Sequence, residues 1–402
     1  MKLPQPNNIA LQHSQKVEAH IADKIHQSGG TITFSDYMEQ VLYAPGLGYY
    51  SAGCTKFGEH GDFITAPEIS PLFSRCIAHA IVPIIGSLRA SSILEVGAGS
   101  GKMAADIILE LYNSEQQLDH YYILERSAEL RERQQQTIQA LPVELADKVT
   151  WLNTLPTVFN GVVLANELLD AMPVTRFQKN NQAVTEMFVG YKSGQFSWQN
   201  GTTSNTRLNS RIAAIESTLG HVLVEGYTSE VNFAAQDWLS SINDILETGY
   251  ILLIDYGYPE KEYYHEQREQ GTLSCFYQHG RHDNPFLNPG LQDITAHIDF
   301  SSLAQTVISE DNNSVTTSAR LQLNAYTTQS NFLMASGLMQ LVQENSQDDV
   351  KQQLVISQQV KKLTMPYDMG EVVKVIGFEK GLATDSGFEL PCFAMRDLRY
   401  QL

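Results

Sequence analysis

The sequence predicts an α/β protein built on a doubly wound, mostly parallel sheet, and three observations lead to this fold class. Between about residues 91 and 170, short apolar runs alternate with helix-length segments, which is the pattern of parallel strands joined by crossover helices. A glycine-rich segment, ILEVGAGSGK at residues 93–102, follows the first of these runs. The alternation breaks near residue 174 and resumes near residue 232, so we expect an inserted α+β lobe.

The residues before the first strand are expected to form an N-terminal helical extension. Residues 9–28 have the apolar spacing of an amphipathic helix, and a second helix is expected after an N-cap at Thr33 or Ser35. A glycine- and tyrosine-rich turn then leads to a helix predicted at residues 71–85. Because this helix directly precedes the first strand, the extension is predicted to roof a ligand site at the edge of the sheet.

The elements of the sheet domain are expected in a regular order. The predicted strands are residues 93–96, 121–125, 148–152, 161–165, 250–255 and 371–379. The predicted helices are residues 101–112, 127–140, 232–246, 328–336 and 350–363. Residues 174–198 alternate with period two and indicate antiparallel hairpins, residues 200–210 are expected to be a polar surface loop, and residues 256–300 form a long aromatic-rich irregular segment. We therefore divide the chain into an extension at 1–90 and a sheet domain at 91–402, with insertions at about 174–225 and 257–315.

The glycines after the first strand predict a ligand-binding turn. Gly97, Gly99 and Gly101 allow a sharp bend without Cβ atoms, and the helix that follows directs its free N–H groups into the same crevice. The third glycine comes one position earlier than in the dinucleotide fingerprint, and Glu95 precedes the turn. A carboxylate favours a cation, so the loop with Ala98 favours S-adenosyl-L-methionine, which carries a sulfonium and an ammonium group. A plain structural turn is the alternative.

Three further acidic residues follow predicted strands. Glu125 ends the second strand, where a carboxylate can accept both ribose hydroxyls of a nucleoside. A solvated charge that caps the helix from Ser127 is the alternative. Glu167 and Asp170 follow a later strand three positions apart, which on a helical turn would place them on one face and allow them to bind a guanidinium together. Capping of a short helix is the alternative here.

Weaker candidates are Glu230, Asp255, His297 and Asp299, for which packing roles are the alternative.

Composition excludes several classes of function. The net charge of −18 over 402 residues argues against binding nucleic acid or an anionic membrane surface and suits a basic substrate. The four cysteines lack metal-ligand spacing, so we expect free thiols, no metal site and a cytoplasmic location. The first residues show neither a secretory nor an organellar pattern, and no apolar run approaches the roughly 18 residues of a membrane span, so we expect no membrane insertion.

Several long strings resemble the MidA-like methyltransferase family, whose mitochondrial members are respiratory complex I assembly factors that methylate protein arginine. These strings are YAPGLGYYSAG, GDFITAPEISPLF, LEVGAGSGK, NELLDAMPV, GTLSCFYQHGRHDNPFLNPGLQDITAHIDF and MGEVVKVIGFEKG. The resemblance implies a Rossmann-like class I S-adenosylmethionine methyltransferase fold with an added lobe. It implies cofactor binding by Glu95, Gly97, Gly99, Gly101, Glu125 and the 63–70 loop, in which Phe63, Thr65 and Ser70 are the candidates. For catalysis it implies Asn166, Glu167 and Asp170.

The chain departs from the family pattern at Ser274, at Phe276 and in the string NAYTTQSNFL, which leaves the substrate open. We predict a methyltransferase acting on arginine side-chain nitrogen of a protein, with a respiratory-complex subunit as one option for the partner. A cofactor-binding assembly or interaction factor without turnover is the alternative, and the glycine spacing disfavours a nicotinamide dehydrogenase. The oligomeric state stays open, with a homodimer as one option.

Overall fold

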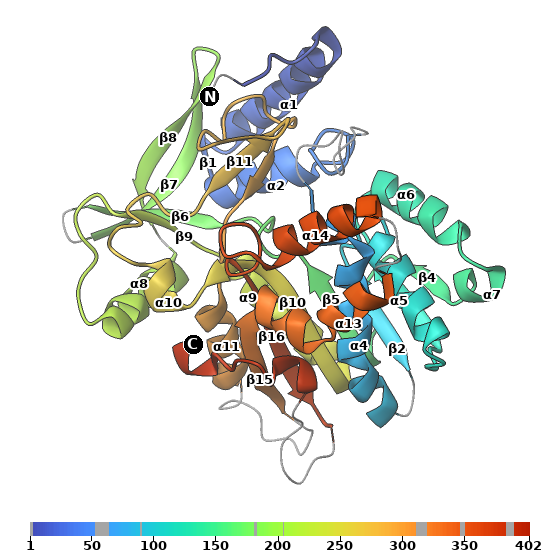
Figure 1. The fold of residues 1–402 in the computed structure, drawn as a ribbon. Helices are drawn as coiled ribbons and strands as arrows, with labels where there is room; N and C mark the ends of the chain where they lie inside the picture. Colours follow the sequence, from blue (N-terminus) through green and yellow to red (C-terminus); the bar gives the residue numbers. More distant parts are fainter. Residues whose placement is uncertain are drawn as a thin grey trace. The chain divides into compact units, whose positions relative to one another are not determined.

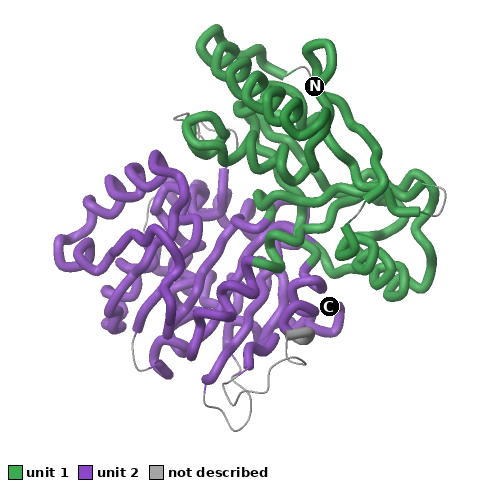
Figure 2. The backbone as a smooth tube through the Cα atoms, turned by 180° about the vertical axis from the view of Figure 1, so that it is seen from behind, with its two compact units in different colours: residues 1–63, 170–237, 258–299 green, residues 64–169, 238–257, 300–402 purple. Residues whose placement is uncertain are grey.

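The computed structural model describes residues 3–52, 64–88, 91–180, 183–203, 205–310, 320–345, 350–382 and 390–402. The chain divides into two compact units, each assembled from three segments (Figure 2). Unit 1 contains residues 1–63, 170–237 and 258–299, and unit 2 contains residues 64–169, 238–257 and 300–402. This division differs from the expected boundary at residue 90, because the apolar side chains of residues 66–85 are buried in the core of unit 2.

Unit 2 is built on a mostly parallel sheet in the strand order β15-β16-β10-β5-β2-β3-β4. The strands are β2 (Ser92–Val96), β3 (His120–Leu124), β4 (Val149–Leu152), β5 (Phe159–Asn166), β10 (Leu246–Tyr258), β15 (Leu321–Thr328) and β16 (Val373–Lys380). Strands β4, β3, β2, β5 and β10 are parallel, whereas β16 runs antiparallel to both of its neighbours. The predicted doubly wound α/β fold is confirmed.

The strand order reverses direction at β2, which has β3 on one side and β5 on the other. All five residues of β2 are buried, as expected for a strand covered on both faces. Open α/β sheets bind their ligands where the order reverses, at the carboxyl ends of the strands. The fold therefore directs attention to the loops that follow β2, β3 and β5.

Helices and short 3₁₀ turns complete unit 2 (Figure 1). They are α3 (Ala66–Ile69), α4 (Pro71–Ser87), α5 (Lys102–Asn113), α6 (Ala128–Gln139), α7 (Val143–Ala146), α9 (Phe233–Ile245, whose first residues belong to unit 1), α11 (Phe300–Glu310), α12 (Gln329–Ala335), α13 (Leu338–Asn345), α14 (Val350–Thr364), η1 (Pro391–Phe393) and η2 (Arg399–Gln401).

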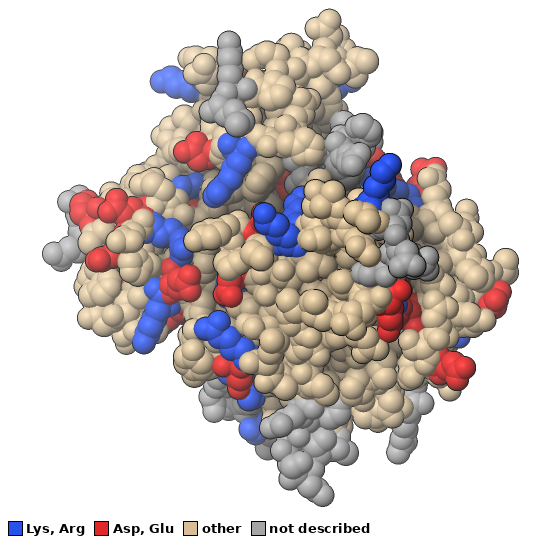
Figure 3. Space-filling view, viewed as in Figure 1, with Lys and Arg blue, Asp and Glu red and all other residues tan. Residues whose placement is uncertain are grey.

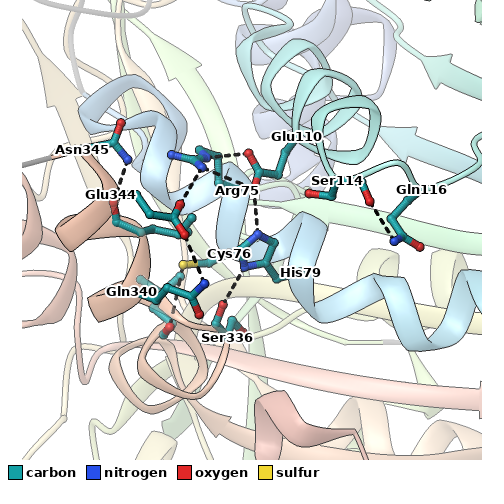
Figure 4. A network of polar contacts seen from close by, with 12 residues as sticks. Arg75, Cys76, His79, Glu110, Ser114, Gln116, Ser336, Gln340, Glu344 and Asn345 are labelled. Carbon is teal, nitrogen blue, oxygen red and sulfur yellow. Dashed lines mark hydrogen bonds and ion pairs between the residues drawn. The ribbon is translucent and has the colours of Figure 1, made fainter.

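A polar network joins three of these helices, α4, α5 and α13 (Figure 4). The Glu110 carboxylate accepts a hydrogen bond of 2.6 Å from Arg75 Nε and lies 2.7 Å from His79 Nε2. Arg75 also reaches Glu344 at 3.4 Å. Burial raises the pKa of Glu110, but the bonds from Arg75 and His79 outweigh it and hold the pKa below its usual value. The network therefore fastens the outer helices together with an ionised carboxylate.

Replacing Glu110 with glutamine is expected to lower the free energy of unfolding by about 2 kcal/mol near neutral pH, because two charge-assisted bonds are weakened. The folded-state pKa of Glu110 is depressed, so its contribution is present above the ordinary value of about 4.3 and lost as the pH falls through the folded-state pKa. Urea unfolding of both proteins at neutral and at acidic pH measures the effect. If the difference in the free energy of unfolding between the two proteins stayed the same at acidic pH, the stabilising role of the ionised Glu110 would be contradicted.

Unit 1 contains two antiparallel sheets and several helices. The larger sheet has the order β1-β7-β6-β9 with β8 beside β7, and a three-stranded sheet has the order β12-β11-β13. The elements are α1 (Asn8–Gln27), β1 (Thr31–Thr33), α2 (Phe34–Tyr43), β6 (Thr175–Asn180), β7 (Ala183–Lys192), β8 (Gln195–Thr202), α8 (Thr206–Leu219), β9 (Thr228–Val231), α10 (Glu260–Tyr263), β11 (Ser274–Tyr277), β12 (Gly280–His282), β13 (Asp293–Thr295) and β14 (Ile298–Asp299).

Three local predictions are wrong. The expected loop at 200–210 is instead the end of β8 and the start of α8, where the Asn205 side chain caps the helix through Leu208 N–H. The segment 256–300, expected to be irregular, contains β11, β12 and β13. The sequence pattern does not predict β15, because a register shift between Leu323 and Ala325 interrupts the alternation of its residues. Pairing with β16 holds this segment as a strand.

Candidate active site

The glycine loop, residues 97–101, joins β2 to α5 in a backbone conformation that needs glycine. Gly97, Gly99 and Gly101 have φ values of 73°, 54° and 81°, a region that residues with a Cβ rarely adopt. A Cβ on Gly97 would lie 2.8 Å from Leu168 Cδ1. Gly101 is the N-cap of α5, and its N–H donates to the carbonyl of Ala98 within the loop at 2.8 Å. The loop therefore presents backbone, not side chains, at the mouth of the helix.

Helix α6 supports the glycine loop from one side. The fully buried Gln134 donates from Nε2 to Gly99 O at 3.1 Å and to Glu125 Oε2 at 2.9 Å. Thr137 Oγ1 donates to Ser100 O at 2.8 Å. The sequence analysis does not include Gln134 among the candidate site residues. Its helical spacing from the buried Leu130 and Ile138 nevertheless places it on the inner face of α6. It fixes the loop and the neighbouring carboxylate relative to each other.

Glu125 follows β3 directly beside the glycine loop. The adjacent strand ends are joined by a 3.0 Å bond from Gly97 N–H to Leu124 O. The Glu125 carboxylate accepts from Ser127 N–H at 2.9 Å as well as from Gln134. The capping alternative is thus partly observed, since Glu125 stabilises the start of α6. The expected contact with ribose hydroxyls stays a prediction, which the position at the carboxyl edge of the sheet supports.

Glu95 lies beneath the loop within β2 and is 1% exposed. Burial raises the pKa of Glu95 to about 7, with a further increase from Glu125, although a 2.6 Å bond from Tyr121 Oη opposes the shift. A buried carboxyl that titrates near neutrality responds strongly to any cation placed near it. Glu95 can therefore act on a cationic cofactor through its charge.

Cofactor binding is expected to depend on pH through Glu95. A sulfonium or ammonium group favours the ionised carboxylate, so binding lowers the Glu95 pKa and releases a proton when the pH is below about 7. The affinity for S-adenosylmethionine should therefore fall by up to about tenfold per pH unit below that value. Calorimetry in buffers of different ionisation enthalpy measures the proton release. Glu95→Gln should remove the dependence, and an unchanged pH profile in that variant would contradict the role of Glu95.

The segment before α4 supplies contacts that the sequence did not indicate. Glu68 on α3 accepts from Ser100 Oγ and, at 2.8 Å, from Lys102 Nζ. These two residues flank Gly101, so α3 is attached to the glycine loop. Thr65 is the N-cap residue of α3, and its side chain makes no capping hydrogen bond to this helix. The buried Ser70 hydroxyl accepts from Leu72 N–H at 3.3 Å and donates to Gln359 Oε1 at 2.8 Å.

Those partners commit the Ser70 hydroxyl to the fold, so its expected cofactor contact, like that of Thr65, stays a prediction. Phe63 lies outside the described residues.

Asn166 and Glu167 stand at the carboxyl end of β5. Glu167 N–H donates to Ile254 O at 2.8 Å, and Glu167 Oε1 accepts from Ala66 N–H at 3.1 Å and from Asn166 Nδ2 at 3.3 Å. Among the described residues, no donor meets the buried Asn166 Oδ1. A buried acceptor without a partner is costly, so this atom suits a donor group on a ligand. Both residues thus lie at the sheet edge that also carries the glycine loop.

The expected helical turn from Glu167 to Asp170 is wrong. Glu167 has φ 49°, in the left-handed region, and the segment is a bend. Asp255 holds the segment in this conformation, because its carboxylate accepts from Leu169 N–H and from Tyr256 N–H, each at 2.8 Å. Asp170 begins a segment of unit 1, where its carbonyl accepts from Ala296 N–H at 2.9 Å. The two carboxylates therefore do not share the face of a helical turn.

The weaker candidates have structural partners. Asp255 fixes the loop as described, and Glu230 accepts from Thr272 N–H at 2.9 Å beside Arg176. Asp299 pairs with Arg211 at 2.6 Å, and His297 N–H donates to Thr272 Oγ1 at 3.0 Å. These contacts favour the packing alternative.

The described part of the chain contains neither a metal-binding cluster nor a membrane-spanning helix. Over these ranges, no group of three or more His, Cys, Asp or Glu side chains could hold a metal ion. Likewise, none of the helices described is long and apolar enough to cross a bilayer. Cys76, Cys275 and Cys392 are free and buried.

Comparisons with known proteins agree with the geometry of the loop. The model of the family described as "Putative S-adenosyl-L-methionine-dependent methyltransferase" matches residues 76–318. A crystal structure of a Burkholderia thailandensis protein bound to S-adenosylhomocysteine is 38% identical, covers 100% of both chains and superposes with a TM-score of 0.92. Rat mitochondrial protein arginine methyltransferase NDUFAF7 is 29% identical over 72% of this chain and 69% of its own. The homologous Caenorhabditis elegans protein is 26% identical over 76% and 75%.

The positive-φ glycines, the adjacent acids and the family match lead to the same cofactor. The chain binds S-adenosyl-L-methionine and acts as a methyltransferase on a substrate. It belongs to the MidA-like family of S-adenosyl-L-methionine-dependent methyltransferases.

Proposed function

We propose that this methyltransferase modifies a side-chain nitrogen of arginine in a protein substrate. The observation that carries the proposal is the Glu167 carboxylate, held at the carboxyl end of β5 by Ala66 N–H in a left-handed conformation. Non-glycine residues in this region are strained and are concentrated at functional sites. The curated relatives named protein arginine methyltransferase support the choice of arginine.

The chemistry of the transfer assigns different tasks to cofactor and protein. The bound cofactor supplies an electrophilic methyl group on its sulfonium. Glu167 would bind the guanidinium through charge-assisted hydrogen bonds and orient one nitrogen. Asn166 Oδ1, a buried acceptor without a described partner, would take a further N–H. Because the guanidinium is protonated below about pH 12, a carboxylate that polarises it also helps to expose a lone pair for the transfer. As the nitrogen takes the methyl group, S-adenosylhomocysteine would leave and the nitrogen would lose one proton, which the Glu167 carboxylate would accept.

The charge of the chain supports a basic protein partner. The net charge is −18, and on the face shown in Figure 3 basic side chains are interspersed with acidic ones. A protein of this charge attracts cationic segments at long range. Asp170, four positions after Asn166 in the chain and buried to 8% exposure, is proposed as a second acidic group for the substrate.

Label transfer tests the proposal. The purified protein is incubated with methyl-labelled cofactor and an extract from cells that lack it, and labelled proteins are mapped by mass spectrometry. We expect the label on arginine nitrogen in one protein or a few. Label on lysine, on a small molecule or on nothing at all would contradict the proposal, and the last result combined with retained cofactor binding would favour the assembly or interaction factor.

We also propose a cytoplasmic location, on the basis of the free thiols, with a respiratory-complex subunit as one option for the partner. The curated relatives are named as mitochondrial proteins. Fractionation of cells that produce the tagged chain tests the location, and recovery of the chain with another compartment would overturn it.

A further inference from the structure

The single-turn helix α3 contacts two parts of the candidate site at once. At one side, the Glu68 carboxylate bonds to Ser100 Oγ and to Lys102 Nζ at 2.8 Å. At the other, Ala66 N–H donates to Glu167 Oε1 at 3.1 Å. Ala66 and Glu68 are two residues apart on the same turn. A displacement of the glycine loop that moves Glu68 must therefore also move the donor that holds Glu167.

The hydrogen bonds of Glu68 with Ser100 and Lys102 involve a buried, ionised carboxylate. The Glu68 side chain is 7% exposed, whereas that of Lys102 is 49% exposed. Burial raises the pKa of Glu68, but the bonds from Lys102 and Ser100 outweigh it and keep the pKa below its usual value. The carboxylate is therefore ionised at neutral pH, and its hydrogen bonds are of the stronger, charge-assisted kind.

Residues at both ends of α3 also pack within unit 2. Ala66 is fully buried, and Ser70, at the C-terminal end of α3, bonds to Gln359 on α14 at 2.8 Å. The Glu167 backbone is held separately by Ile254 O at 2.8 Å. With the Glu167 backbone held in this way, α3 can act on the Glu167 side chain. Ala66 N–H, at 3.1 Å, is one of the donors that position this carboxylate, beside Asn166 Nδ2 at 3.3 Å.

We propose that α3 couples the cofactor loop to the Glu167 carboxylate, with Glu68 as the positioning residue. Binding of the cofactor orders the glycine loop, the loop orders Glu68 through Ser100 and Lys102, and α3 then sets the position of Glu167. The catalytic meaning of this coupling rests on the proposed function, whereas the coupling itself does not. By linkage, a substitution at Glu167 that removes the contact with Ala66 N–H must also alter cofactor affinity.

A double-substitution cycle read by calorimetry with S-adenosylhomocysteine tests the coupling. Glu68→Gln is expected to weaken binding about tenfold, because a charge-assisted contact to the loop is lost. Glu167→Ala removes the acceptor for Ala66 N–H and is expected to weaken binding roughly fivefold in the wild-type background. In the Glu68→Gln background the same change should have almost no effect. Equal effects of Glu167→Ala in both backgrounds would overturn the proposal.

Amide exchange gives a second readout that needs no methyl acceptor. S-adenosylhomocysteine should slow the exchange of Ala66 N–H in the wild type and leave it unchanged in Glu68→Gln. Lys102→Met breaks the ion pair from its exposed partner and should act in the same direction. If S-adenosylhomocysteine slowed the exchange of Ala66 N–H in both Glu68→Gln and Lys102→Met, the proposal would be contradicted.

Glu132→Gln, at an exposed position on α6, is the matched control and should change neither measurement. Thermal melting of each variant shows that the comparisons are made between folded proteins. Because these measurements use binding alone, loss of the coupling and failure to methylate arginine are separate results.

Discussion

Replacing Gly97 with valine is expected to reduce the affinity for S-adenosylhomocysteine by more than about 100-fold, the largest effect that the structure predicts for binding. Gly97 has φ 73°, and a Cβ at this position would lie 2.8 Å from Leu168 Cδ1. A β-branched side chain is especially poor at positive φ. The substitution therefore forces the loop out of the conformation that exposes its backbone to the cofactor.

Calorimetric titration of the purified variant measures this loss. Gly97→Ala should weaken binding less, about tenfold, because alanine at positive φ is less strained than a β-branched residue and its Cβ meets only the flexible end of Leu168. The matched control is Gly86→Val on α4, where a Cβ would meet no heavy atom of the described residues within 4 Å. The control should bind normally. If the Gly97→Val protein melted like the wild type and its affinity for S-adenosylhomocysteine were within a few-fold of the wild-type value, the cofactor would not need this loop.

Replacing Glu167 with glutamine is expected to slow methyl transfer about 10³-fold with little change in cofactor affinity. Glutamine keeps an oxygen that can accept from Ala66 N–H, so the contact observed at 3.1 Å survives. What it loses is the negative charge that binds and polarises the guanidinium. The effect should fall on the transfer step and on the Michaelis constant of the acceptor, not on that of the cofactor.

Single-turnover transfer to the acceptor found by label mapping measures the rate. Glu167→Asp keeps the negative charge but shortens the side chain. Its transfer rate should stay well below that of the wild type, because the carboxylate no longer reaches the same position. Glu132→Gln serves again as the charge-matched control. A Glu167→Gln enzyme with normal turnover would remove Glu167 from the chemistry, while the cofactor site would remain as described.

The sequence was sufficient for those features that depend on local physics. The apolar β2 strand, buried at every position, and the positive-φ glycines after it follow directly from burial and from the absence of a Cβ. The position of Glu125 at the next strand end follows from the parallel crossover. The β2 strand, the glycine loop and the position of Glu125 can therefore be predicted from neighbouring residues in the chain.

Features that depend on distant contacts could not be predicted in this way. Glu68 lies far from Ser100 and Lys102 in the chain, and only the packing of α3 brings them together. Glu167 was expected on a helical turn, but Asp255 fixes the loop in another conformation. Strand β15 owes its order to β16 and not to its own pattern. In each case a tertiary contact overrides the local preference.

The most direct test is the structure of the crystallised protein in complex with S-adenosylhomocysteine. We expect the nucleoside against the backbone of residues 97–101, with both ribose hydroxyls within hydrogen-bonding distance of the Glu125 carboxylate. A complex in which the ligand binds elsewhere, with Glu125 bonded only to Ser127 and Gln134, would contradict the assignment of the cofactor site.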